Sequence, residues 1–225
     1  VASTHDWLLF FTNKGRVYRA KVHELPDAGR DARGQHVANL MAFKPDESIA
    51  AVLSIKDYAA APYLVLSTKS GLVKKSPLTE YDSPRTGGLI AISLRDGDEV
   101  VGATLATDKD ELLLVSRKGM SLRFSANNDS IRSMGRSATG VIGMKFRAGD
   151  ELLAMARVGG SDKNLFVFTA TDGGFGKKSP LDEYRIQNRG GIGIKAAKIN
   201  EERGGLVGAL VISDQDEILA ITSNG

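Results

Sequence analysis

Short apolar runs that end in glycine, asparagine or aspartate recur along the whole chain. Examples are 63–68 and 165–169, which are rich in Val, Leu and Phe. Runs of this length and composition, closed by turn residues, are typical of β-strands. No window of twelve or more residues has the apolar spacing of an amphipathic helix, and the nearest helical candidates are single turns at 77–81 and 180–184. The pattern predicts an all-β protein with almost no helix.

Three features repeat in one order about every fifty residues. An apolar run ends in a glycine turn, an arginine-glycine segment follows, and an acidic pair precedes the next apolar run. The turn glycines are Gly15, Gly71, Gly119, Gly174 and Gly225, at intervals of 56, 48, 55 and 51 residues. Such a period indicates a blade-type repeat. We therefore expect a β-pinwheel or propeller-like array of about four-stranded blades. The repeats would be approximately 7–62, 63–110, 111–164 and 165–216, with the start of a fifth at 217–225.

Composition narrows the protein class. The chain has 225 residues, of which 42% are hydrophobic and none is cysteine. It can therefore form a core, whereas disulfides, thiol catalysis and sulfur-ligated zinc are excluded. No apolar run reaches the length of a membrane span. We expect a soluble, cytoplasmic protein that makes no membrane contact. Because the chain lacks an initial Met and stops inside the fifth repeat, we expect it to be part of a longer protein.

No residue pattern indicates catalysis, a metal or a cofactor. His5, His23 and His36 have no partner at metal-ligand spacing, and no G-x-S-x-G elbow occurs. The acidic pairs recur at one repeat position, which favours solvated turns over paired catalytic carboxylates. The segment 190–193 resembles a phosphate-cradling turn but completes no nucleotide-binding pattern. The sequence thus predicts a non-catalytic domain.

Opposite charges are sorted along the chain. The windows 14–36, 69–88, 117–140 and 171–195 hold 20 basic and 9 acidic residues, although the whole chain has a net charge of only +3. Equivalent positions around an axis would form a basic band, which is typical of a nucleic-acid surface. Solubilisation of exposed hairpins is the alternative. The aromatic residues lie mostly in strand runs, so duplex DNA is favoured over single strands. The predicted DNA-binding residues are Arg16, Arg19, Arg33, Lys74, Lys75, Arg85, Lys118, Arg123, Arg136, Lys177, Lys178 and Arg189.

The repeated strand-glycine-basic unit, at 71–76 and 174–179, resembles the C-terminal domain of the A subunit of DNA gyrase. This β-pinwheel is shared with the A-type polypeptide of topoisomerase IV. The resemblance implies a ring of about six hairpin-swapped blades. It also implies a basic perimeter that wraps duplex DNA to support negative supercoiling. The partners would be DNA, the rest of gyrase A and the gyrase B polypeptide. The isolated domain would be a monomer, and the holoenzyme would be bacterial and nucleoid-associated.

The family's signature box reads Q-R-R-G-G-K-G. The nearest match here is Gln187, Asn188, Arg189, Gly190, Gly191, Ile192 and Gly193, which has Asn for the first Arg and Ile for the Lys. The resemblance implies a degenerate second box, with the principal box upstream of Val1. A plain tight turn is the alternative for these glycines. The alternatives to a gyrase domain are its topoisomerase IV counterpart, a propeller-type protein-binding scaffold and, last, a repeat enzyme.

Overall fold

The computed structural model describes residues 2–29, 31–85 and 87–220, in which every regular element is a β-strand or a 3-10 turn. The strands are β1 (Trp7–Thr12), β2 (Arg16–Lys21), β3 (Ile49–Ile55), β4 (Tyr63–Thr68), β5 (Leu72–Pro77), β6 (Leu89–Ile90), β7 (Val100–Ala106), β8 (Glu111–Ser116), β9 (Met120–Ser125), β10 (Val141–Ile142), β11 (Leu152–Val158), β12 (Phe166–Thr171), β13 (Gly176–Pro180), β14 (Ile194–Lys195) and β15 (Leu206–Ile212). The 3-10 turns are η1 (Val22–Glu24), η2 (Val37–Asn39), η3 (Leu78–Tyr81) and η4 (Leu181–Glu183). The all-β prediction is confirmed, and the two predicted single turns are η3 and η4.

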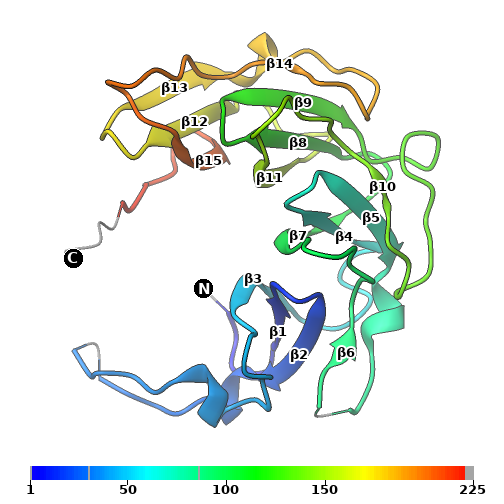
Figure 1. Cartoon of the computed structure of the whole chain (residues 1–225). Coiled ribbons are helices and arrows are strands. Elements are labelled where there is room, and N and C mark those ends of the chain that lie inside the picture. The colour runs from blue at the N-terminus through cyan, green and yellow to red at the C-terminus, as the bar shows by residue number, and fades with distance from the viewer. Residues whose placement is uncertain (1, 30, 86, 221–225) are drawn as a thin grey trace.

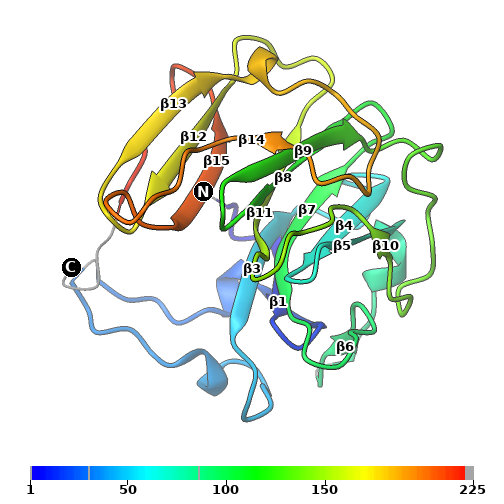
Figure 2. The ribbon, with the colours of Figure 1, turned by 45° about the horizontal axis from the view of Figure 1, so that its top comes forward.

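Four antiparallel sheets follow one another in chain order around an arc (Figures 1 and 2). Their strand orders are β3-β1-β2-β6, β10-β5-β4-β7, β11-β8-β9-β14 and β13-β12-β15. The inner strands β3, β7, β11 and β15 line the inside of the arc, and the outer strands β6, β10 and β14 lie on its outside (Figure 1). The last part of the expected fifth repeat, 221–225, lies outside the described residues.

The outer strand of each of the first three sheets comes from a later part of the chain. Strand β6 pairs with β2, β10 with β5, and β14 with β9. Each of these two-residue strands belongs to the repeat that follows the sheet it completes. The expectation of about four strands to a blade is confirmed for the first three sheets, but each of these sheets combines strands of two repeats. The described part of the fourth sheet has three strands.

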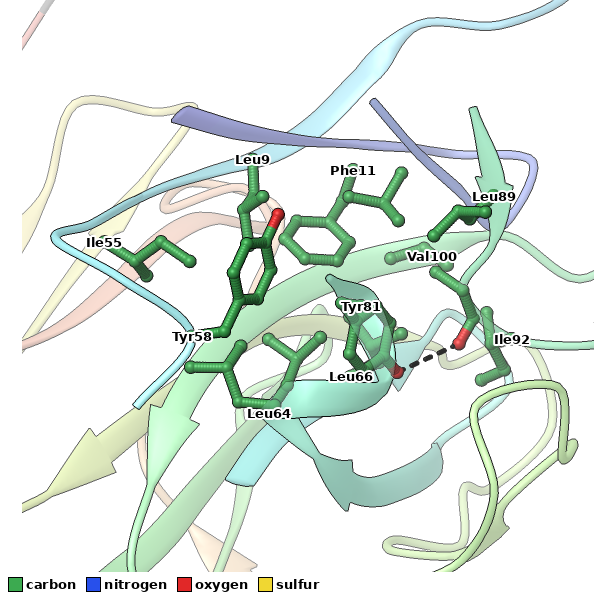
Figure 3. Packing of buried hydrophobic residues seen from close by; sticks show 13 residues of the cluster. Leu9, Phe11, Ile55, Tyr58, Leu64, Leu66, Tyr81, Leu89, Ile92 and Val100 are labelled. Atoms are coloured by element: carbon green, nitrogen blue, oxygen red, sulfur yellow. Dashed lines mark hydrogen bonds between the residues drawn. The ribbon is translucent and has the colours of Figure 1, made fainter. Parts of the chain in front are cut away.

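The hydrophobic core consists of layers between neighbouring sheets. Leu9, Phe11 and Ile55 of the first sheet pack against Leu64 and Leu66 of the second (Figure 3). Val65, between those two leucines, points the other way and packs against the third sheet. Because both faces of a middle sheet are covered, the sequences of its strands are continuous apolar runs and do not alternate between apolar and polar residues.

Glycine is required at the first three hairpin turns because the following repeat passes close to them. Gly71 has φ +86, and a Cβ there would lie 2.4 Å from the carbonyl oxygen of Met144. Met144 follows β10, and its amide donates to the Gly71 carbonyl at 3.1 Å. The turn glycine of one repeat thus lets the exchanged strand of the next repeat dock by backbone hydrogen bonds.

The recurrent acidic pairs stabilise these hairpin turns. Asp98 accepts from the Ser70 amide at 2.9 Å and from the Ser70 hydroxyl at 2.5 Å. The next residue, Glu99, pairs with Lys14 of the preceding repeat at 3.2 Å. Asp150 makes similar contacts one repeat later, accepting from the Ser116 hydroxyl at 2.7 Å and from the Lys118 amide at 2.9 Å. One acid of each pair thus caps a hairpin turn, and the other can link neighbouring repeats.

Candidate nucleic-acid interface

The outer strands have one covered and one exposed position. Their first residues pair with the second residue after a hairpin glycine, as Leu89 pairs with Val17. Their second residues, Ile90, Ile142 and Lys195, are all exposed. Since successive side chains of a strand point to opposite sides, these three residues face solvent at one equivalent position of three sheets.

The segments that carry the outer strands contain no acidic residue. We call 83–95, 130–147 and 185–198 the outer segments; they hold two, four and four basic residues, respectively. The exposed basic side chains among these are Arg85, Arg95, Arg132, Lys145, Arg147, Arg185, Lys195 and Lys198. The segments on the outside of three consecutive sheets therefore carry positive charge without carboxylates of their own.

Two of the predicted arginines connect neighbouring outer segments. The Arg136 guanidinium donates to the carbonyl of Ile90 in β6. Arg189 repeats this contact one blade later, donating to the carbonyl of Ile142 in β10 at 3.0 Å and to that of Ser130 at 2.6 Å. Both side chains are partly exposed, and a guanidinium has five N–H donors, so each can still serve a further acceptor. The structure thus brings both arginines to the outer edge in equivalent positions.

The box-like segment 187–193 lies against the outer strand of the second sheet. The Gly190 amide donates to the Gly143 carbonyl at 2.6 Å, and the Lys145 amide donates to the Gly191 carbonyl at 2.8 Å. Gly193 has φ +81, and a Cβ there would lie 2.0 Å from the Ser121 carbonyl oxygen. Of the other box positions, Asn188 and Ile192 are exposed and Gln187 is half-buried. The segment is therefore held against the second sheet by main-chain hydrogen bonds, and its last glycine is needed for close packing. We call residues 187–193 the strap.

Lys74 and Lys75 do not lie on the perimeter, which corrects their assignment as DNA contacts. Both are fully buried. Lys74 donates to the Tyr81 hydroxyl at 2.9 Å and to the Arg136 carbonyl, and Lys75 donates to Asp108 at 2.9 Å. They belong to the second sheet, where the first and third sheets cover both faces. A phosphate cannot reach either ammonium group.

The fourth residue after each hairpin glycine is basic in all four repeats, and this recurrence has a structural cause. Arg19 pairs with Asp82 at 2.9 Å, Lys75 with Asp108 at 2.9 Å, Arg123 with Glu111 at 2.5 Å, and Lys178 with Asp214. Arg19, Lys75 and Lys178 also lie over aromatic rings at the start of the neighbouring strand. Lys75, Arg123 and Lys178 thus link segments of their own repeat, Arg19 links its strand to the following repeat, and the charge of each cation is already partnered.

The remaining predicted residues lie in different places. Arg16 donates to the Gly87 carbonyl at 2.6 Å and so contacts the first outer segment. Arg85 is exposed in that segment, while Arg33 is exposed on the connection between β2 and β3. Lys118, in a hairpin turn, donates to the Ala148 carbonyl at 3.0 Å, and Lys177 donates to that of Ala196 at 2.8 Å. The structure thus gathers only part of the predicted set at the outer edge.

Sequence analysis missed several exposed basic residues of the outer segments: Arg95, Arg132, Lys145, Arg147, Arg185, Lys195 and Lys198. The signal that could have identified them was the absence of acids from three stretches at equivalent repeat positions. The basic windows obscured this signal because they include the partnered cations of the strands and end before Arg95, Lys145, Arg147 and Lys198.

The pKa of buried Lys74 lies far below its ordinary value. Burial lowers the pKa of its ammonium from 10.5 to about 7, the Glu80 carboxylate opposes this shift, and the Arg136 charge adds to it. Burial also raises the pKa of its neighbour Tyr81 to about 12. Tyr81 donates to the Ala91 carbonyl at 3.3 Å (Figure 3). Through the Arg136 carbonyl, Lys74 holds the second outer segment against the second sheet.

Neither a metal centre nor a membrane span was found in the described ranges. No three His, Cys, Asp or Glu residues there are arranged to hold a metal ion. No helix in the same ranges has the length and apolarity needed to cross a membrane.

Comparison with known proteins identifies the family. A family model described as DNA gyrase C-terminal domain, beta-propeller, matches residues 6–56, 62–107, 110–158 and 166–213. The chain is 65% identical to the DNA gyrase A protein of Streptomyces coelicolor and 55% identical to that of Mycolicibacterium smegmatis. Each match covers 100% of this chain and 26% of the relative, so the chain spans about a quarter of the length of these bacterial proteins.

Solved structures agree with this result. A crystal structure of the C-terminal domain of DNA topoisomerase IV superposes with a TM-score of 0.82 at 32% identity, covering 94% of this chain and 65% of that one. A DNA gyrase A C-terminal domain superposes with a TM-score of 0.79 at 26% identity, covering 95% of this chain and 68% of that one. The resemblance drawn from the repeats is confirmed, and the chain belongs to the DNA gyrase C-terminal domain, beta-propeller family.

Proposed function

We propose that this chain is a non-catalytic domain that binds and wraps duplex DNA around its outer edge. The observation that carries the proposal is the set of outer segments, which bear ten basic residues and no acidic residue across three adjacent sheets. A surface rich in positive charge suits the DNA backbone, whose phosphates supply most of the sequence-independent affinity. The arc of sheets gives this surface a curvature around which a duplex can bend (Figure 1).

Backbone docking makes the surface rigid before DNA arrives. The outer strands and the box-like strap are held by main-chain hydrogen bonds such as those of Gly143 and Lys145. A preorganised contact surface loses less conformational entropy on binding. The free energy of the phosphate contacts is therefore available for bending DNA, because none of it is needed to fold the protein surface.

In the longer protein, wrapping would present a DNA crossing to the strand-passage machinery and so support negative supercoiling. The rest of gyrase A and the gyrase B polypeptide would then be its partners, with DNA cleavage and ATP hydrolysis located outside this domain. The setting would be the bacterial cytoplasm, at the nucleoid. The curated relatives favour gyrase over topoisomerase IV, because the high-identity matches are DNA gyrase A proteins.

The test is a pair of double variants measured against long duplex DNA over a range of salt concentrations. Lys145→Glu with Lys195→Glu reverses two charges of the outer segments, whereas Lys56→Glu with Lys109→Glu reverses two exposed charges in turns that follow inner strands. Each phosphate contact contributes about −0.9 to the slope of log K against log salt. We expect a steep slope for the wild type and the control pair, and a shallower slope with weaker binding for the outer pair.

The sequence of the duplex should not change this result, because phosphate contacts carry no base identity. A wild-type slope close to that of a single contact would contradict the proposal. Equal losses for the outer and control pairs would also contradict it, since binding would then not depend on the outer edge.

A further inference from the structure

The exposed position of the outer strands carries isoleucine in two sheets and lysine in the third. Ile90 and Ile142 are 48% and 39% exposed, and they pair with the residue directly after a hairpin glycine. Lys195 has the same register in β14, where it pairs with Met120. The position therefore faces outward in all three sheets, and a charged side chain is compatible with the fold there.

Both isoleucines lie beside an arginine. Arg136 donates to the carbonyl of Ile90, and Arg189 donates to that of Ile142. The outer segments around them lack acidic residues. Each isoleucine is thus an apolar side chain with a guanidinium group at its own main chain, in segments whose own charges are all positive, although the Glu80 carboxylate of a neighbouring turn accepts from the Arg136 amide at 2.6 Å.

This combination fits one class of partner. The charge requires a polyanion, and the apolar groups require a partner that also offers apolar surface. Duplex DNA offers both, since sugar faces line the minor groove between its phosphates. Apolar wedges such as isoleucine are a recurrent means by which proteins bend DNA from the minor-groove side.

We propose that Ile90 and Ile142 contact the minor-groove side of the wrapped duplex and help to bend it. This inference rests on the proposed function and adds to it an apolar contribution independent of charge. The neighbouring arginines would hold the flanking phosphates, while the isoleucine side chains would be removed from water against the sugars.

The first experiment separates the apolar contribution from the ionic one. Ile90→Thr with Ile142→Thr keeps β-branched side chains, which suit a strand. The control, Val207→Thr with Leu210→Thr, replaces two similarly exposed apolar residues of inner strand β15. We expect the outer pair to lose roughly threefold to tenfold in affinity for a long duplex and to bend it less, as measured by energy transfer between its ends. The salt slope should stay unchanged, because no phosphate contact is lost.

The second experiment uses the absence of cysteine from the chain. Ile142→Cys and Val207→Cys each introduce a single thiol, whose alkylation rate reports access to that position. Saturating duplex at low salt should slow alkylation at position 142 about tenfold or more by occlusion and leave position 207 unaffected.

These outcomes distinguish the inference from the function on which it rests. If the wild type binds DNA with a steep salt slope but the threonine pair binds and bends it equally well, or position 142 stays reactive in the complex, the isoleucine contact is overturned. If the wild type itself shows a shallow slope, the DNA-wrapping function fails instead.

Discussion

At the scale of single residues, burial decides what each basic side chain does. Lys74 and Lys177 are both the third residue after a hairpin glycine, and both begin a Lys-Lys-Ser-Pro sequence, yet Lys74 is fully buried and Lys177 is exposed. The second sheet has neighbours on both faces, whereas the fourth is the last sheet described. A buried lysine loses its hydration, which disfavours its charged form. The same local sequence therefore yields an internal hydrogen-bond donor in one sheet and a surface charge in another.

The depressed pKa of Lys74 predicts a pH-dependent stability. Between pH 7 and 10.5 the unfolded chain keeps a proton on Lys74 that the folded chain has released. The free energy of unfolding should therefore rise with pH in this window, by up to about 1.4 kcal/mol per pH unit, and this contribution should be flat below pH 7. Denaturant unfolding of the wild type and Lys74→Met at pH 6, 7.5 and 9 measures the difference between them. A difference that does not change with pH would refute the assignment.

Glycine positions of the box-like segment should differ in their tolerance of alanine. A Cβ at Gly193 would lie 2.0 Å from the Ser121 carbonyl oxygen, and φ there is +81, whereas a Cβ at Gly191 would have only ordinary contacts from 3.8 Å outward. We expect Gly193→Ala to destabilise the fold by about 2 kcal/mol or more and Gly191→Ala to have little effect. Thermal unfolding of the two variants checks this, and equal melting temperatures would show that packing does not explain Gly193.

At the scale of elements, the two-residue outer strands and the strap 187–193 act as one unit. Arg189 links the strap to Ser130 and to Ile142 of β10, so it positions the segment as well as carrying charge. Ile192, where the family box has lysine, is 40% exposed and has no charge to offer a phosphate. With Asn188 and Ile192 in place of the Arg and Lys of the family box, the strap has two cations fewer than that box.

We predict opposite effects at these two positions. Ile192→Lys should strengthen DNA wrapping by adding a phosphate contact, and Arg189→Ala should weaken it by removing both a charge and a strap contact. Plasmid topology assays and affinity measurements report wrapping and binding separately. Arg189→Lys is the matched control, because it keeps the charge but loses the fork that reaches two carbonyls. If neither Ile192→Lys nor Arg189→Ala changes wrapping in a folded protein, the segment is a turn without a role in binding.

At the scale of the whole molecule, strand exchange joins structure and proposed function. The outer strand of each of the first three sheets is supplied by the following repeat, so none of these sheets is complete without its neighbour. The contacts that complete the sheets are the same contacts that place the outer segments on the outside of the arc (Figure 2). DNA bound along this edge would touch several repeats at once. The force with which the bent duplex tends to straighten would then be borne by the whole array of sheets rather than by one blade.

The sequence by itself determined the strand content, the fifty-residue repeat and the family, because these depend on local turn chemistry and on apolar runs that recur at fixed spacing. Tertiary structure decided which strand completes which sheet and which cations reach solvent. The exchanged strands are only two residues long, too short to show a pattern. The burial of Lys74 and Lys75 depends on the sheets on either side of them, which are separated from them along the chain. A side chain's neighbours across a sheet face are set by long-range packing, and that packing turned part of an apparent DNA-binding band into internal ion pairs and hydrogen bonds.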